Sequence, residues 1–287
     1  MRLNRFDTSK IKVRGGGGGG ARRAGGVGCG TLVIALIAAL VFGVDPAQMI
    51  GAIDGGQTQG APTQQQTNVS EEQLCSQNQY ATEACNALQS LNETWQPAFE
   101  RADIPFRQPE LVLYPSGPVR TDGCGNASSA AGPFYCPADL GIYIDTAFYD
   151  QLAQMSGTGG DFARLYVIAH EYGHHIQNLT GVATQVRSLQ QQNPRRSNEL
   201  QVRMELQADC YAGVWAGKNR NRIERGDMEE GLRAASAIGD DSIQRRSGQR
   251  INPENFTHGT SQQRMDALRR GLQGADDTVC DTYFDMR

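Results

Sequence analysis

The segment HEYGH, residues 170–174, restricts the fold and the chemistry of this chain more than any other feature of its sequence. It lies in a helical pattern that runs from Asp161, a suitable N-cap, to Gly181 and repeats its apolar residues at helical spacing. Four residues make little more than one turn, so His170 and His174 project from one face and can hold one zinc ion. The alternative is a chance string in a structural helix, which background residue frequencies produce on the order of once per hundred chains. A third ligand would decide between the two.

Two other residues of HEYGHH cannot belong to the ligand pair. Glu171 lies about 100° around the helix from His170, beside the metal, where it can take a proton from a water whose pKa the metal lowers towards about 7. His175 lies about 100° from His174 and cannot join the ligands without unwinding the helix. We expect it at the cleft wall, in a hydrogen bond close to the site, or on the helix surface.

A second helical pattern, residues 197–217, supplies the missing ligand. Within RMELQADCYAGVWAG, Glu205 and Asp209 are four residues apart and share one helix face. Glu205 would complete the set of two histidines and one glutamate that holds a catalytic zinc, and Asp209 would accept the spare N–H of a ligating histidine. The alternative places both on a solvated face, like Glu199. Their apolar neighbours argue against it, because an unpaired carboxylate is costly there unless a cation compensates it.

The N-terminal region differs in composition from the rest of the chain. Residues 1–30 carry seven basic side chains and one acidic side chain, whereas the remainder holds 20 basic against 30 acidic. Residues 25–44 contain no charge, a length close to the ~20 residues that a helix needs to cross a bilayer. A cleavable signal peptide and a buried core helix are the alternatives, but no small-x-small cleavage site follows, which favours an uncleaved anchor. The positive-inside rule then keeps the N-terminus in the cytoplasm and exports everything after residue 44.

These boundaries divide the chain into four parts: a basic, glycine-rich cytoplasmic N-terminus (1–24), a transmembrane helix (25–44), a flexible linker (45–70) and a globular domain (71–287). Residues 71–102 read as one or two helices, and ELVLYPS (110–116) and LGIYIDTAFY (140–149) have the composition of strands. The mixture predicts an α+β domain.

Six cysteines fall in the part predicted to be exported, and an even number is typical of disulfides in an oxidising compartment. Proximity in the sequence favours Cys75–Cys85 and Cys124–Cys136, which leaves Cys210–Cys280 by elimination. Buried free thiols are the alternative for a cytosolic domain. The acidic balance of this part disfavours a nucleic-acid partner.

HEYGHHIQ followed by ELQADCYAGVW, with an N-terminal anchor and the later HGTSQQRMDAL, resembles the "putative neutral zinc metallopeptidase" family of bacterial membrane-anchored proteins. More distantly, it is similar to the gluzincin clan, in which a glutamate from a following helix meets the H-E-x-x-H helix. The resemblance covers essentially the whole chain and is most specific from about residue 110 onwards. It implies one catalytic Zn2+, held by His170, His174 and Glu205, with Glu171 as catalytic base and Asp209 behind a ligand.

The same resemblance implies three further features. The domain would be zincin-like, with a small mixed sheet, an active-site helix and a following helical subdomain. His258 would donate a hydrogen bond to the oxyanion, although a loop histidine is more often exposed or structural. Only their position in the sequence, and not the resemblance, suggests that Asp240 and Asp241 orient it. An extended peptide would add to the strand within YCPADLGIYID, where Leu140–Ile144 would offer the backbone edge.

The sequence thus predicts a zinc-dependent metalloendopeptidase anchored by one helix in the inner membrane, with its catalytic domain outside the cytoplasm and a peptide or protein as substrate. One alternative is a membrane-anchored zinc scaffold or chaperone-like factor with little turnover, and Glu171 argues against it because a structural site needs no base there. The other is a zinc amidase that cuts a non-protein cell-wall amide, and it stays open.

Overall fold

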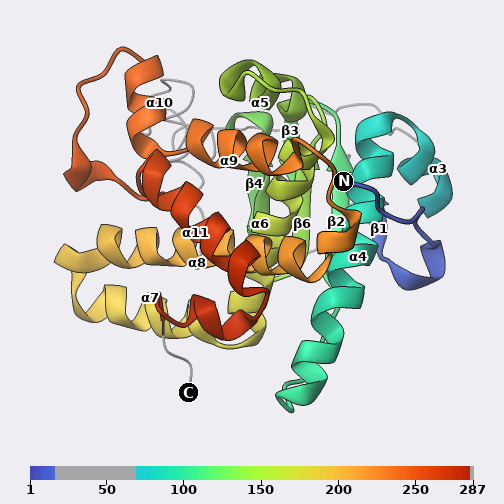
Figure 1. Ribbon diagram of the computed structural model, residues 1–287, viewed down its shortest axis with the longest axis horizontal. Helices are drawn as coiled ribbons and strands as arrows, with labels where there is room; N and C mark the ends of the chain where they lie inside the picture. The colour runs from blue at the N-terminus through green and yellow to red at the C-terminus, as the bar shows by residue number, and fades with distance from the viewer. Residues whose placement is uncertain (17–68, 285–287) are drawn as a thin grey trace, which may run out of the picture.

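Four strands form the central sheet of the computed structural model, which describes residues 1–16 and 69–284 (Figure 1). In order across the sheet they are β1 (Val13–Gly15), β2 (Glu110–Tyr114), β6 (Gly141–Asp145) and β5 (Phe134–Cys136). The first three are parallel, and β5 runs antiparallel to β6. The two predicted strands are confirmed, except that the end of the second belongs to helix α5 (Phe148–Ser156).

The two faces of the sheet are both covered. Successive side chains of a strand point to opposite faces, and all five residues of β6 are buried. Leu111, Leu113 and Ile144 belong to the main core, under the helices. Val112 and Tyr143 face the other way and pack with a two-stranded hairpin, β3 (Pro118–Arg120) and β4 (Asn126–Ser128). The sheet is therefore an inner layer rather than a surface.

The helices surround α6 (Asp161–Leu179), which packs against the sheet, α4, α8 and α9. In Figure 1 the N-terminal helices lie on one side of α6 and the C-terminal helices on the other. The remaining α-helices are α3 (Glu71–Ser76), α4 (Gln79–Arg101), α7 (Val182–Gln192), α8 (Ser197–Lys218), α9 (Asp227–Ala237), α10 (Asp240–Arg246) and α11 (Ser261–Gly274). Short 3-10 turns are η1 (Thr8–Lys10), η2 (Ser129–Ala131), η3 (Pro194–Arg196), η4 (Arg220–Arg222), η5 (Pro253–Asn255) and η6 (Asp277–Cys280).

Both predicted site helices are confirmed as α6 and α8, and the region 71–102 forms two helices, α3 and α4. One detail differs: Gly160 is the N-cap of α6 and Asp161 its first helical residue. The second half of α8 is buried all round, because α11 packs on it backbone to backbone. A Cβ on Gly271 would lie 1.9 Å from the carbonyl oxygen of Cys210, so only glycine permits this approach. The α+β class is thus present, with helix dominating.

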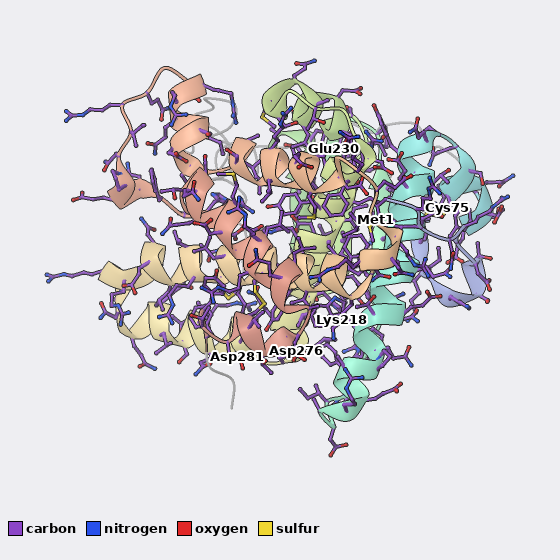
Figure 2. All side chains as sticks on the ribbon, viewed as in Figure 1. Met1, Cys75, Lys218, Glu230, Asp276 and Asp281 are labelled. Carbon is purple, nitrogen blue, oxygen red and sulfur yellow. A yellow bond between two sulfur atoms is a disulfide. The ribbon has the colours of Figure 1, made fainter. Side chains whose placement is uncertain are left out.

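The prediction that residues 1–24 lie apart from the domain is wrong for residues 1–16. β1 pairs with β2, and the amino group of Met1 lies 3.0 Å from Asp161 Oδ2 and 2.9 Å from Asp227 Oδ2. Figure 2 labels Met1 and also Glu230, on α9. The basic composition suggested a solvated segment, but its apolar residues are buried and Arg14 pairs with Glu110. Because β1 is hydrogen-bonded into the sheet, residues 1–16 lie on the same side of any membrane as the domain, and a cytoplasmic N-terminus facing an exported domain is incompatible with this pairing.

The predicted span, residues 25–44, and nearly all of the predicted linker lie outside the described residues. Within residues 1–16 and 69–284, none of the helices has the length and apolar character needed to cross a bilayer. All three predicted disulfides are confirmed: Cys75–Cys85, Cys124–Cys136 and Cys210–Cys280.

Candidate metal centre

α6 and α8 bring the three predicted ligands together. Nε2 of His170 lies 3.2 Å from Oε2 of Glu205, and Nε2 of His174 lies 3.6 Å from Oε1. One ligand atom from each residue falls within 4.8 Å of the others. Tetrahedral zinc with bonds of about 2.0–2.2 Å keeps its ligand atoms roughly 3.3–3.5 Å apart, so these separations fit zinc. Two imidazole nitrogens and one carboxylate are also the donor set of catalytic zinc sites, which leave a fourth position open.

The close crossing of the two helices depends on Gly173, the fourth residue of HEYGH. A Cβ at this position would lie 2.7 Å from Cα of Ala208, closer than real contacts allow. Ala208 sits between Glu205 and Asp209 on α8. Glycine at 173 therefore lets the carboxylates of α8 reach the histidines of α6.

Asp209 is completely buried and lies behind His170, as predicted. Its Oδ1 is 2.8 Å from Nδ1 of His170, whose Nε2 is thereby directed towards Glu205. The hydroxyl of Tyr166 donates to the same oxygen at 2.5 Å. Arg264 donates from Nε to Oδ2 at 2.8 Å and from Nη2 to Oδ1 at 3.0 Å. These donors compensate the buried negative charge of Asp209. The carboxylate in turn holds the imidazole of His170 in one tautomer, with Nδ1 as the donor.

The pKa values of these groups record the charge balance of the site. Burial works to lower the pKa of His170, but the charge and hydrogen bond of Asp209 outweigh it and raise the pKa to about 9. Burial works to raise the pKa of Asp209, but Arg264 and His170 outweigh it and lower the pKa to about 2. Burial also works to lower the pKa of His174, but Glu205 outweighs it and raises that pKa. Burial works to raise the pKa of Glu205, but His174 and His170 outweigh it and hold that pKa well below its usual range. With its pKa at about 9, His170 carries a proton at pH 7 that metal binding must displace.

Glu171 lies beside this group and is not part of it. Its side chain is buried, and within the described part of the chain its carboxylate has no hydrogen-bond partner. Burial raises its pKa, while the charges of His170 and His174 oppose that rise. A carboxylate next to the ligands with no protein partner is free to accept a proton from a water molecule.

His258 approaches the site from the loop between α10 and α11. Oδ2 of Asp240 accepts the backbone N–H groups of Thr257, His258 and Gly259, at 2.8, 2.6 and 3.0 Å. Oδ1 of Asp240 lies 3.1 Å from Nδ1 of His258. The loop lies against α8 next to Glu205, because a Cβ on Gly259 would be 3.4 Å from Cδ2 of Leu206. Of the two acids considered from sequence, Asp240 orients His258, whereas Asp241 accepts from Ser261 instead.

His175 is fully buried on another side of α6, and its ring nitrogens bond to none of the predicted ligands. Its Nε2 donates to the carbonyl oxygen of Arg107 at 2.7 Å, and its Nδ1 accepts from the hydroxyl of Tyr135 at 3.0 Å. Burial lowers the pKa of His175 to about 4. It is a neutral core residue, and none of the three places that we expected describes it fully.

This burial of His175 predicts a specific pH dependence of stability. An unfolded histidine titrates near 6.5, so between pH 6.5 and 4 the unfolded chain binds a proton that the folded chain does not, and the free energy of unfolding falls as the pH falls. Between pH 7 and pH 5 this residue should cost about 2 kcal/mol. His175→Gln keeps a donor and an acceptor but does not titrate, so its loss over the same range should be smaller by that amount. Urea unfolding of both metal-free proteins at the two pH values measures the difference, and parallel pH profiles would contradict it.

The sequence did not single out Arg264 or Tyr166, although each carries a signal. Tyr166 precedes His170 by four residues and so shares its helix face. Arg264 occupies the apolar stripe of α11, at helical spacing from Leu268 and Gly271. An arginine on a buried face needs an anion, and Asp209 provides it.

The predicted substrate strand is corrected by the sheet order. β6, which contains most of Leu140–Ile144, lies between β2 and β5, so both of its edges are already paired. β5 lies at one end of the sheet, and its outer side makes no backbone hydrogen bond with the described residues. β5 packs on α6, where Tyr135 contacts His175 and Asn178. Alternating composition marked a strand correctly but could not order the strands.

The chain is similar to known proteins over most of its length. Residues 4–283 match the family described as "Putative neutral zinc metallopeptidase", so the match includes β1. The chain is 44% identical over 254 residues to "Uncharacterized protein YpfJ" of Escherichia coli (strain K12), covering 88% of this chain and 86% of that protein. It is 42% identical over 207 residues to "Uncharacterized protein Rv2575" of Mycobacterium tuberculosis (strain ATCC 25618 / H37Rv), covering 68% and 67%. No solved structure matches significantly.

A family match over nearly the whole chain, together with two imidazoles and a carboxylate at the spacing of zinc ligands, identifies the metal as Zn2+. The chain belongs to the "putative neutral zinc metallopeptidase" family.

Proposed function

We propose that this protein is a zinc-dependent metalloendopeptidase, with His170, His174 and Glu205 as the zinc ligands and Glu171 as the general base. The observation that carries the proposal is the buried carboxylate of Glu171, which stands beside the ligand group without a hydrogen-bond partner in the described chain. Among the described residues the ligand group contains three side chains, whereas structural zinc sites are almost always closed by four. This difference favours an enzyme over a zinc scaffold.

The chemistry follows from the position of each side chain. Zinc, when bound, polarises a carbonyl oxygen and makes water a stronger nucleophile near neutral pH. Glu171 accepts the proton of the attacking water and then passes it to the nitrogen of the leaving amine. Asp209, held by Tyr166 and Arg264, keeps Nε2 of His170 turned towards the ligand group throughout.

His258 is proposed to donate a hydrogen bond to the oxyanion of the tetrahedral intermediate. Asp240 fixes both its backbone and its Nδ1, so the ring presents Nε2 away from Asp240. A donor that is already oriented loses little in reorganisation when charge develops on the substrate.

The substrate is proposed to be an extended segment of a peptide or protein, bound along the free edge of β5. This edge offers backbone groups with which an extended peptide could pair as a further strand. We also propose that the domain works outside the cytoplasm. Three disulfides support an oxidising compartment.

Zinc content and proteolysis of the purified full chain test the function. We expect one zinc per chain and cleavage of an unfolded protein such as casein at internal bonds, lost with a chelator and restored by added zinc. The same preparation should leave purified cell-wall peptide crosslinks intact. Cleavage of the crosslinks without cleavage of casein would replace the peptidase by an amidase, and absence of zinc would overturn the site.

A further inference from the structure

His174, the second proposed ligand, is backed by two glutamines rather than by an acid. Its Nδ1 lies 2.9 Å from Oε1 of Gln177, one helical turn further along α6. Nε2 of Gln177 donates to the carbonyl oxygen of Met204 at 2.7 Å and to Oε1 of Gln207 at 3.1 Å. Nε2 of Gln207 donates to the carbonyl oxygen of Cys280 at 3.4 Å. Both glutamines are completely buried.

We call the hydrogen-bonded chain from His174 through Gln177 and Gln207 to Cys280 the relay. Which group donates at each of its links is fixed by the carbonyl oxygen of Cys280. A backbone carbonyl only accepts, so Gln207 must turn its NH2 group to Cys280 and its oxygen to Gln177. Met204 likewise requires the NH2 group of Gln177, which leaves the oxygen of Gln177 facing His174. Nδ1 of His174 must then be the donor.

This polarity has a consequence for metal binding. A neutral histidine with its proton on Nδ1 carries a lone pair on Nε2, and Nε2 is the atom that faces Glu205. The relay therefore selects the tautomer that can bind zinc and also fixes the plane of the ring.

The carbonyl at the end of the relay is itself held in place. Cys280 is the last residue of η6 and is bonded to Cys210 of α8, the residue after Asp209. Asp276 and Asp281, which flank η6, mark this segment in Figure 2, and η6 packs against α8.

We propose that Gln177 and Gln207 are positioning residues for zinc, which transmit the fixed orientation of the Cys280 carbonyl to Nδ1 of His174. The inference rests on the proposed zinc site and extends it to the C-terminal segment. One disulfide, Cys210–Cys280, then supports both histidines, because it adjoins Asp209 behind His170 and terminates the relay behind His174.

Zinc dissociation constants of full-length variants, measured by competition with a chromogenic chelator, test the relay. Gln177→Met preserves volume but removes the acceptor, and should raise the dissociation constant about 10- to 100-fold. Gln207→Met, two links from the metal, should raise it less, because Met204 still orients Gln177. Gln185→Met, at an exposed glutamine on α7, is the control and should leave it unchanged. The absorption spectrum of the cobalt-loaded protein should shift in the first two variants and not in the third.

Gln177→Glu separates orientation from packing, since glutamate keeps an acceptor for Nδ1. Its dissociation constant should stay closer to that of the wild type than that of Gln177→Met, although its melting temperature falls. A packing role predicts the reverse order of the two variants, and that order would overturn the proposal, as would wild-type affinity in Gln177→Met. If Gln177→Met does not fold, the zinc dissociation constant of Gln207→Met is the deciding measurement. A value equal to that of Gln185→Met would overturn the relay. Failure of the wild type to bind zinc would instead overturn the proposed function.

Discussion

Glu171→Gln should lose peptide hydrolysis by a factor on the order of 10²–10⁴ while keeping one zinc per chain. Glutamine has the shape of glutamate but cannot take a proton from the attacking water. Glu171 is not among the three grouped ligand side chains, so the change leaves the donor set intact. Initial rates on an unfolded protein substrate and zinc content, both measured on the same preparation, check the two halves of the result.

Two other outcomes would contradict this prediction, and each has a different meaning. Hydrolysis at the wild-type rate would exclude Glu171 as the base. Loss of zinc together with activity would mean that Glu171 binds the metal or holds a ligand, contrary to its lack of hydrogen bonds within the described residues.

Glu205→Ala should weaken zinc binding by a factor on the order of 10²–10³. Zinc sites with four ligands bind the ion with a free energy of about 10–16 kcal/mol, so one ligand contributes about 3–4 kcal/mol on average. The change also removes the charge that faces Nε2 of both histidines. Chelator competition measures the affinity.

Glu199→Ala provides a matched control for Glu205→Ala. It lies on the same helix, is exposed, and among the described residues forms its one ion pair with Arg196 at the surface. Such a pair contributes little, so zinc affinity should be unchanged. If both variants bind zinc like the wild type, α8 does not supply the third ligand.

The parts of the site that could be predicted depend on spacing within one helix. HEYGH and ELQAD each place their side chains on one face whatever the rest of the fold does, and this is why the grouping of His170, His174, Glu205 and Asp209 could be predicted. The disulfides followed from closeness along the chain and from elimination.

The parts that could not be predicted depend on which elements meet. No pattern in α11 says that Arg264 reaches Asp209, and nothing in α6 alone says that Gln177 meets Gln207. Gly173 likewise reads as a weak helix former until the approach of Ala208 explains it. Strand order is a property of this kind too, which is why β6 was predicted to offer an edge although β2 and β5 flank it.

β1 was missed for a different reason. A strand of three residues next to a run of glycines has too short a pattern to be recognised, and the basic side chains around it are typical of a solvated tail. Its stability comes from its partner strand and from buried residues such as Phe6 and Ile11. These contacts are distant in sequence and leave no local signal.

The position of β1 sets the order in which the sheet can be built. At about 5–20 residues per second, the ribosome reaches Tyr114 roughly 5–20 s after Gly15, so β1 waits that long for its partner. Lys10, Lys12 and Arg14 are suited to this interval, because charges beside apolar residues discourage association with other chains. β1 therefore stays without its partner strand until β2 has been synthesised, and the sheet forms around β1 only then.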